Sequence, residues 1–259
     1  MKNFVPIYKK EIKAFFSSPI AYTVIVMFQI MSGYFFYSVV RYYDSMSTYA
    51  NRRHQTWEAL SLMDGIFRPM YDNISVLLLF LVPIITMRLF AEEKKSGTIE
   101  MLFTYPLKDQ EIITGKFLAS LTVLVTMYIP TLLYPIIISM FGKIEWPVIV
   151  STYLGLILMG MSFLSLGIFI SSLTENQVIA AAGTFGMLIT FWIIGWSTDF
   201  TNPGLASLGQ VMAYLSLVKH FDNFVKGVID TQDIIFYLIF NGYFLYLTYG
   251  ILGSKKWRG

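Results

Sequence analysis

The chain alternates long apolar runs with short polar segments. A helix of about 20 residues, rising about 1.5 Å per residue, crosses a hydrocarbon core of about 30 Å. The second apolar run, Ile74–Met87, is the shortest, and it crosses the hydrocarbon core only if Met70–Asn73 or Arg88 lie at its interfaces. The pattern predicts an all-α polytopic membrane protein with six transmembrane helices, forming a single transmembrane domain over residues 1–259: Ile20–Val40, Ile74–Met87 with an extension to Ala91, Phe117–Phe141, Val148–Leu173, Val178–Thr198 and Ile234–Ser254.

Residues 1–19 precede the first apolar run and have two different faces. On a helix, apolar residues share one face and lysines gather on the other: Phe4, Tyr8, Ile12 and Phe15 against Lys2, Lys9, Lys10 and Lys13. We predict an interfacial amphipathic helix, with Lys9, Lys10 and Lys13 as membrane-interface residues that face anionic lipid headgroups. The alternative is a basic leader that only satisfies the positive-inside rule.

The segment Arg88–Lys116 is the longest charge-rich stretch between two apolar runs. A helix is expected to leave the second span and to stop at Ser96-Gly97, where glycine tolerates the left-handed conformation. A short second helix is predicted over Thr98–Thr104, because its apolar residues follow helical spacing and Pro106 ends it.

Two stretches of this sequence resemble segments of a known protein family. The run Glu92–Glu100, followed by Pro106 and Gly115-Lys116, resembles the cytoplasmic loop between the second and third spans of ABC-2-type transporter permeases, closest to their gliding-motility and copper-processing branches. A second stretch resembles the segment before the last span of those permeases: Leu217, His220-Phe221, Phe224, Gly227-Val228-Ile229-Asp230 and Asp233.

The resemblance implies a cytoplasmic coupling helix between the second and third spans, which docks into a separate ATP-binding subunit. It also implies that ATP and Mg²⁺ are bound by that subunit, and that a second permease copy is present as a homodimer or paralogue heterodimer. The residues implied for ATPase coupling are Glu92, Glu93, Gly97, Thr98, Glu100, Pro106, Gly115 and Lys116.

Composition supports the membrane class, since 56% of residues are hydrophobic and only 14% are charged. The net charge of +3 is small and dispersed, which disfavours nucleic-acid binding. There is no cysteine, and His54 and His220 lack metal-ligand spacing, so each is read as a surface or packing residue. The two Gly-Lys pairs lack the remainder of a phosphate-binding loop, so this chain is not expected to be the ATPase or another enzyme.

Charge distribution predicts the orientation. Of the 19 Lys and Arg residues, 12 fall on the side that holds both termini and Arg88–Lys116. The positive-inside rule therefore places these segments in the cytoplasm, for a multi-pass protein of the plasma (bacterial inner) membrane. The five clear apolar runs contain no charged residue or histidine, which disfavours an ion-coupled carrier.

Two external segments are long enough to hold structure. Arg41–Asn73 suggests a short helix near Trp57–Leu60, and is either a surface for an external partner or a variable loop. Between residues 197 and 233, Leu205–Leu208 and Val211–Val218 are too short to span, so we predict re-entrant or interfacial helices. Glycines are expected to allow close helix contacts in the fourth and fifth spans: Gly155, Gly160, Gly167, Gly183 and Gly186.

The leading functional hypothesis is the permease subunit of an ATP-driven exporter. The alternative is a non-transporting anchor or assembly subunit that links a cytoplasmic partner to an external one, and a third reading is a channel or ion-coupled carrier. A neighbouring gene for an ATPase would favour the first. The sequence leaves open the substrate, the direction of transport, and whether the protein transports a solute or transmits mechanical work.

Overall fold

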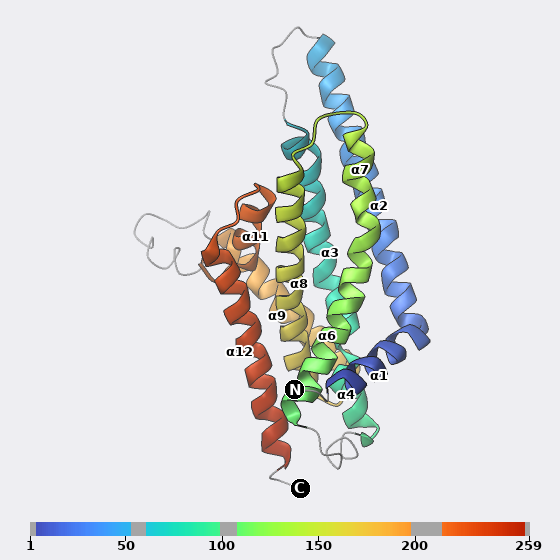
Figure 1. Ribbon diagram of the computed structural model, residues 1–259, viewed down its shortest axis with the longest axis vertical. Helices are drawn as coiled ribbons and strands as arrows, with labels where there is room; N and C mark the ends of the chain where they lie inside the picture. Colours follow the sequence, from blue (N-terminus) through green and yellow to red (C-terminus); the bar gives the residue numbers. More distant parts are fainter. Residues whose placement is uncertain (1–3, 53–60, 99–107, 198–213, 257–259) are drawn as a thin grey trace.

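The computed structural model describes residues 4–52, 61–98, 108–197 and 214–256, and the elements within these ranges are helices (Figure 1). In chain order they are α1 Phe4–Ser17, α2 Pro19–Arg52, η1 Met63–Phe67, α3 Arg68–Thr86, α4 Arg88–Lys95, α6 Asp109–Tyr128, η2 Ile129–Leu132, α7 Leu133–Ser139, α8 Trp146–Leu173, α9 Gln177–Ser197, α11 Leu217–Val225 and α12 Thr231–Lys256.

Six helical stretches in the described part of the chain are long and apolar enough to cross a membrane, which confirms the all-α polytopic class. They are Pro19–Thr48, Met63–Lys95, Asp109–Ser139, Trp146–Leu173, Gln177–Gly195 and Thr231–Ser254. Each apolar run predicted from the sequence lies within or largely overlaps one of them.

Both predicted boundaries of the external loop Arg41–Asn73 are wrong. The first span continues as α2 to Arg52, and the second begins at Met63, well before the first residue of its apolar run. Polar residues on these extensions lower the local hydropathy without breaking the helix. The short helix expected near Trp57–Leu60 lies outside the described residues.

Two helices form the centre of the bundle. The most apolar windows of the second and fourth spans are each 72% buried, whereas that of the first span is 17% buried. The second span is therefore one of the two central helices, although it is the shortest apolar run. Pro83 lies inside α3, and the span is interrupted at Met87, directly before α4 begins at Arg88.

Close packing around α8 depends on its glycines, as the sequence predicted. A Cβ on Gly155 would lie 2.6 Å from the Cβ of Phe224, and one on Gly167 would lie 2.2 Å from Thr86 Oγ1. Gly160 faces Leu124 in the same way. These glycines let α11, α3 and α6 approach three sites along one helix. The prediction is wrong for Gly186, where an added Cβ would meet nothing within 4 Å.

The third span is interrupted where the sequence places prolines. The 3₁₀ segment η2 contains Pro130 and separates α6 from α7, in which Pro135 is buried. Proline lacks an amide donor, so the regular α-helical bonding ends at this point.

Between the fifth and sixth spans, the described residues contain one short helix, and most of the two helices predicted there lies outside the described part of the chain. Leu205–Leu208 and most of Val211–Val218 lie outside the described residues, and the observed helix α11 starts at Leu217. It buries Phe221 and Phe224 and packs against α8. The charged residues of α11 lower its mean hydropathy, so a search for apolar runs does not detect this helix.

The bundle has two ends. We call the end that holds α1, α4, the start of α6 and the end of α12 the basal end, and the end that holds η1, α7 and α11 the distal end (Figure 1). α1 lies across the basal end and packs along α6. That this helix lies at the membrane interface stays a prediction.

Candidate functional site

A buried cluster of charges joins three helices at the basal end. The ammonium of Lys116, on α6, is 1% exposed and lies 2.9 Å from Glu11 Oε1 of α1 and 2.9 Å from Glu93 Oε2 of α4. It also donates a hydrogen bond of 2.7 Å to the carbonyl of Leu89. The ammonium thus makes hydrogen bonds to Glu11 and Leu89 and an ion pair with Glu93, so two carboxylates and a carbonyl oxygen surround the buried charge.

Lys10 extends the cluster to the surface. Its ammonium donates a hydrogen bond of 2.9 Å to Glu93 Oε1 and lies 3.7 Å from Glu11 Oε1. Partial burial alone would lower the pKa of Lys10, but the hydrogen bond to Glu93 and the two negative charges raise it above its usual value. Lys10 therefore stays protonated, and two cations face two carboxylates at the junction of α1, α4 and α6.

A glycine sets the distance between α1 and α6. A Cβ on Gly115 would lie 2.8 Å from Ile7 Cγ2 and 3.3 Å from the carbonyl oxygen of Phe4. Only glycine allows this approach without displacing α1. Because Gly115 directly precedes Lys116, the same contact brings Glu11 within reach of the Lys116 ammonium.

On its other side, α4 is held by α8. The hydroxyl of Ser171 accepts hydrogen bonds from the amides of Phe90 and Ala91, at 3.1 Å and 3.2 Å, and donates one to the carbonyl of Met87. Met87, the residue at the N-cap position, makes no side-chain cap. Ser171 thus supplies the cap of α4 from a different helix. The buried ammonium of Lys94 donates to the carbonyl of Ser172.

Replacing Ser171 with Ala should lower the free energy of unfolding by about 1 kcal/mol, because two amides of α4 lose their acceptor. Thermal unfolding of the purified protein in detergent would measure the change. Ser139→Ala is the matched control, since that exposed hydroxyl bonds only within its own helix. Equal melting temperatures for the two variants would show that Ser171 does not cap α4.

The residues predicted for ATPase coupling separate into two groups. Glu93, Gly115 and Lys116 are internal, in contacts that hold the helices together. Glu92 is 56% exposed and lies 3.6 Å from Arg88. Gly97 has a φ of +69°, the left-handed conformation expected after the helix, and Thr98 bonds the hydroxyl of Ser96. Glu100, Pro106 and the predicted helix beyond Thr98 lie outside the described residues.

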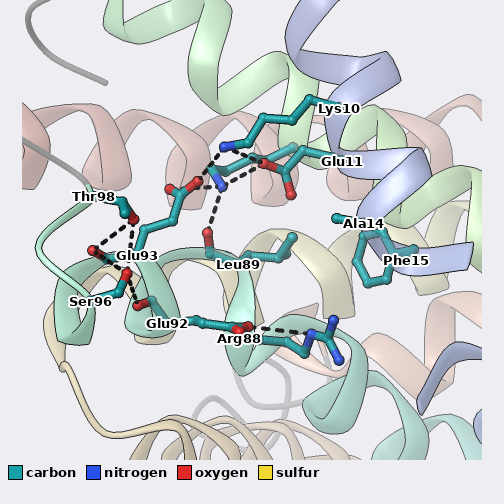
Figure 2. A pocket seen from close by; sticks show the side chains of 11 residues that line it. Lys10, Glu11, Ala14, Phe15, Arg88, Leu89, Glu92, Glu93, Ser96 and Thr98 are labelled. Carbon is teal, nitrogen blue, oxygen red and sulfur yellow. Dashed lines mark hydrogen bonds and ion pairs between the residues drawn. The ribbon is translucent and has the colours of Figure 1, made fainter. Parts of the chain in front are cut away.

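Between α1 and α4 lies a pocket of about 330 Å³ (Figure 2). It is lined by Glu92 and Thr98 together with the ion-pair cluster of Lys10, Glu11, Glu93 and Lys116. Figure 2 shows Lys10 and Glu11 pointing toward Glu93, with Ser96 and Thr98 at one end of the pocket and Phe15 at the other. Charged side chains and the apolar side chains of Leu89 and Phe15 line this pocket together.

The lysines predicted at the membrane interface also differ from one another. Lys9 and Lys13 are exposed on α1. Lys10 turns toward Glu93, so it belongs to the ion-pair cluster as well. The face of α1 that is most buried is slightly rotated from the predicted one, and consists of Ile7, Glu11 and Phe15.

Sequence reasoning missed Glu11 and Ser171. Glu11 had a detectable signal, because it lies four residues from both Ile7 and Phe15 on one side of the helix. Ser171 had none, since its partners are backbone groups of another helix.

Six membrane-spanning helices in the described part of the chain, with a buried centre and a charged junction at one end, define a multi-pass membrane protein. The chain belongs to the ABC-2 transporter family, because the model of the ABC-2 family transporter protein matches residues 5–251. It is therefore a permease component of an ABC transporter, the membrane part and not the ATPase. No individual curated protein matches it. The likeness to the gliding-motility and copper-processing branches stays a prediction.

Proposed function

We propose that this permease component works as part of an exporter, driven by a separate cytoplasmic ATP-binding subunit that docks at the basal end. ATP and Mg²⁺ are bound by that subunit, and a second permease copy, identical or paralogous, completes the transport path. The basal end then faces the cytoplasm of a bacterial inner membrane, with both termini on that side. Membrane lipids surround the bundle, and the distal end is available to an external partner.

The ion-pair cluster supports this proposal most directly. Glu93 belongs to α4, whose exposed end carries Glu92 and leads to Gly97 and Thr98. The same helix is tied to α6 and α1 through Lys116 and Glu11. A displacement of this exposed end by a docked subunit would therefore move α1, α4 and α6 as one body, which is the kind of rigid-body switch that couples distant sites.

Recovery of an ATPase with the solubilised protein tests the proposal. Glu92→Lys should weaken binding of the ATP-binding subunit by about tenfold, since an exposed carboxylate that meets a cation is reversed in charge. The measurement is affinity purification from the native membrane, with mass spectrometry and an ATP hydrolysis assay of the recovered complex. Glu93 is unsuitable for this test, because its reversal would also break the internal cluster.

Glu145→Lys is the matched control. Glu145 is exposed directly before α8, at the distal end, so the substitution makes the same charge change away from the proposed docking surface. An equal loss of ATPase in both variants would argue for a general charge effect. If the unaltered protein recovers no ATPase under gentle conditions, the anchor or assembly role is favoured.

A further inference from the structure

A second buried polar cluster lies at the distal end, between α11 and α12, and the proposed function does not use it. His220 of α11 is 8% exposed and Asp233 of α12 is 3% exposed. Their closest atoms, Nδ1 of the imidazole and Oδ1 of the carboxylate, are 2.5 Å apart. Asn223 donates a hydrogen bond of 2.9 Å to Oδ2 of the same carboxylate. These residues belong to the second stretch that the sequence singled out.

The second ring nitrogen of His220 also faces an acceptor. Nε2 lies 2.9 Å from the carbonyl oxygen of Tyr214, which cannot donate a hydrogen bond. A neutral imidazole carries one N–H and one lone pair, so it can satisfy only one of these two contacts. If Asp233 is ionised, both contacts are satisfied only when each ring nitrogen carries a proton.

The surroundings favour a charge pair over a neutral acid beside a neutral ring. The hydrogen bond from Asn223 stabilises the ionised form of Asp233. The imidazole stacks on Phe236 with ring centroids 3.9 Å apart, and aromatic faces attract cations.

No other titratable group described near the His220 ring takes the place of Asp233 as its ionised partner. Tyr237 of α12 is directed to the carbonyl of Leu217, and Tyr214 contacts the ring by its edge. Asp222, on α11, is paired with Arg68 and Lys226. α8 and α9 also pack against α11, and their sequences contain no Asp, Glu, Lys, Arg or His.

We propose that His220 and Asp233 form a proton-binding site that fastens α11 to α12. With the proton bound, His220 donates from Nδ1 to Asp233 and from Nε2 to Tyr214. When the proton leaves, one ring nitrogen presents a lone pair to an oxygen, and that contact becomes repulsive. Attachment of α11 therefore weakens as the pH rises and strengthens as it falls. The site is independent of the basal cluster and does not rest on the docking of an ATPase.

The chain has only two histidines, so the protonation state of His220 can be observed directly. The His54→Gln protein, labelled with nitrogen-15 histidine and reconstituted in nanodiscs, contains a single imidazole. Its ring-nitrogen signals at neutral pH should both be those of protonated nitrogens. A titration to higher pH should convert one of them to an unprotonated signal, with simultaneous faster amide exchange in the α11 peptide after correction for intrinsic rates.

Two variants in this background separate a proton site from simple packing. Asp233→Asn should shift the ring to its neutral form at the pH where the parent protein is charged. Asp230→Asn removes an exposed carboxylate nearby and should leave the ring signals unchanged. An unprotonated ring nitrogen in the parent at neutral pH, or equal spectra for parent and Asp233→Asn, would overturn the proton-binding site. A change in α11 exchange without a change in ring protonation would do the same.

Discussion

Replacing Lys116 with Met is expected to lower the free energy of unfolding by about 3–5 kcal/mol, because it leaves two carboxylates at the junction of three helices without their shared cation. Glu11 and Glu93 each lie 2.9 Å from the ammonium that is removed. Lys10 can still neutralise one of them in part, since it bonds Glu93. Chemical or thermal unfolding of the purified protein would measure the loss.

Lys95→Met is the control for this experiment, because it removes an exposed lysine from the same segment of the chain. A triple variant, with Lys116, Glu11 and Glu93 all changed to Met, should recover most of the stability, since no buried charge is then left unpaired. If Lys116→Met were as stable as Lys95→Met, the ammonium would not be the centre of the junction.

Gly155→Ala is expected to lower the free energy of unfolding by about 1–3 kcal/mol, although alanine normally favours a helix. The added methyl group would lie 2.6 Å from Cβ and 2.8 Å from Cγ of Phe224. These atoms are close to the backbone of α11, so the helix as a whole must move. Thermal unfolding in detergent would detect the change.

Gly186→Ala gives the matched comparison, since the same substitution meets open space there. It should be neutral or stabilising. Combining Gly155→Ala with Phe224→Ala tests the contact itself, because the smaller side chain vacates the space that the methyl group needs. The double variant should therefore lose less free energy of unfolding than the two single variants added together. Additive losses would show that the contact between Gly155 and Phe224 is not the cause of the strain.

Hydropathy predicted the six spans well, because a membrane helix must be apolar over most of its length. It failed at the helix ends, where polar residues continue the helix. Lys116 and Asp233 each directly precede an apolar run, Phe117–Phe141 and Ile234–Ser254. Both were left outside the spans, yet both are buried. A search limited to charge-free runs cannot recognise such residues.

Partners on other helices were also beyond the reach of sequence patterns. Glu11 and Lys116 are separated by 105 residues, and nothing in the spacing of either segment relates them. By contrast, the left-handed conformation of Gly97 and the packing role of Gly155 were predicted, because each depends on a local property of glycine.

The residues of the ion-pair cluster are also synthesised in a particular order. Its carboxylates come from α1 and the second span, but its buried ammonium belongs to the third. While the chain is being synthesised, Glu11 and Glu93 therefore emerge before the cation that neutralises both. The contacts of α1 with Lys116 can therefore form only after the first residues of α6 have been synthesised.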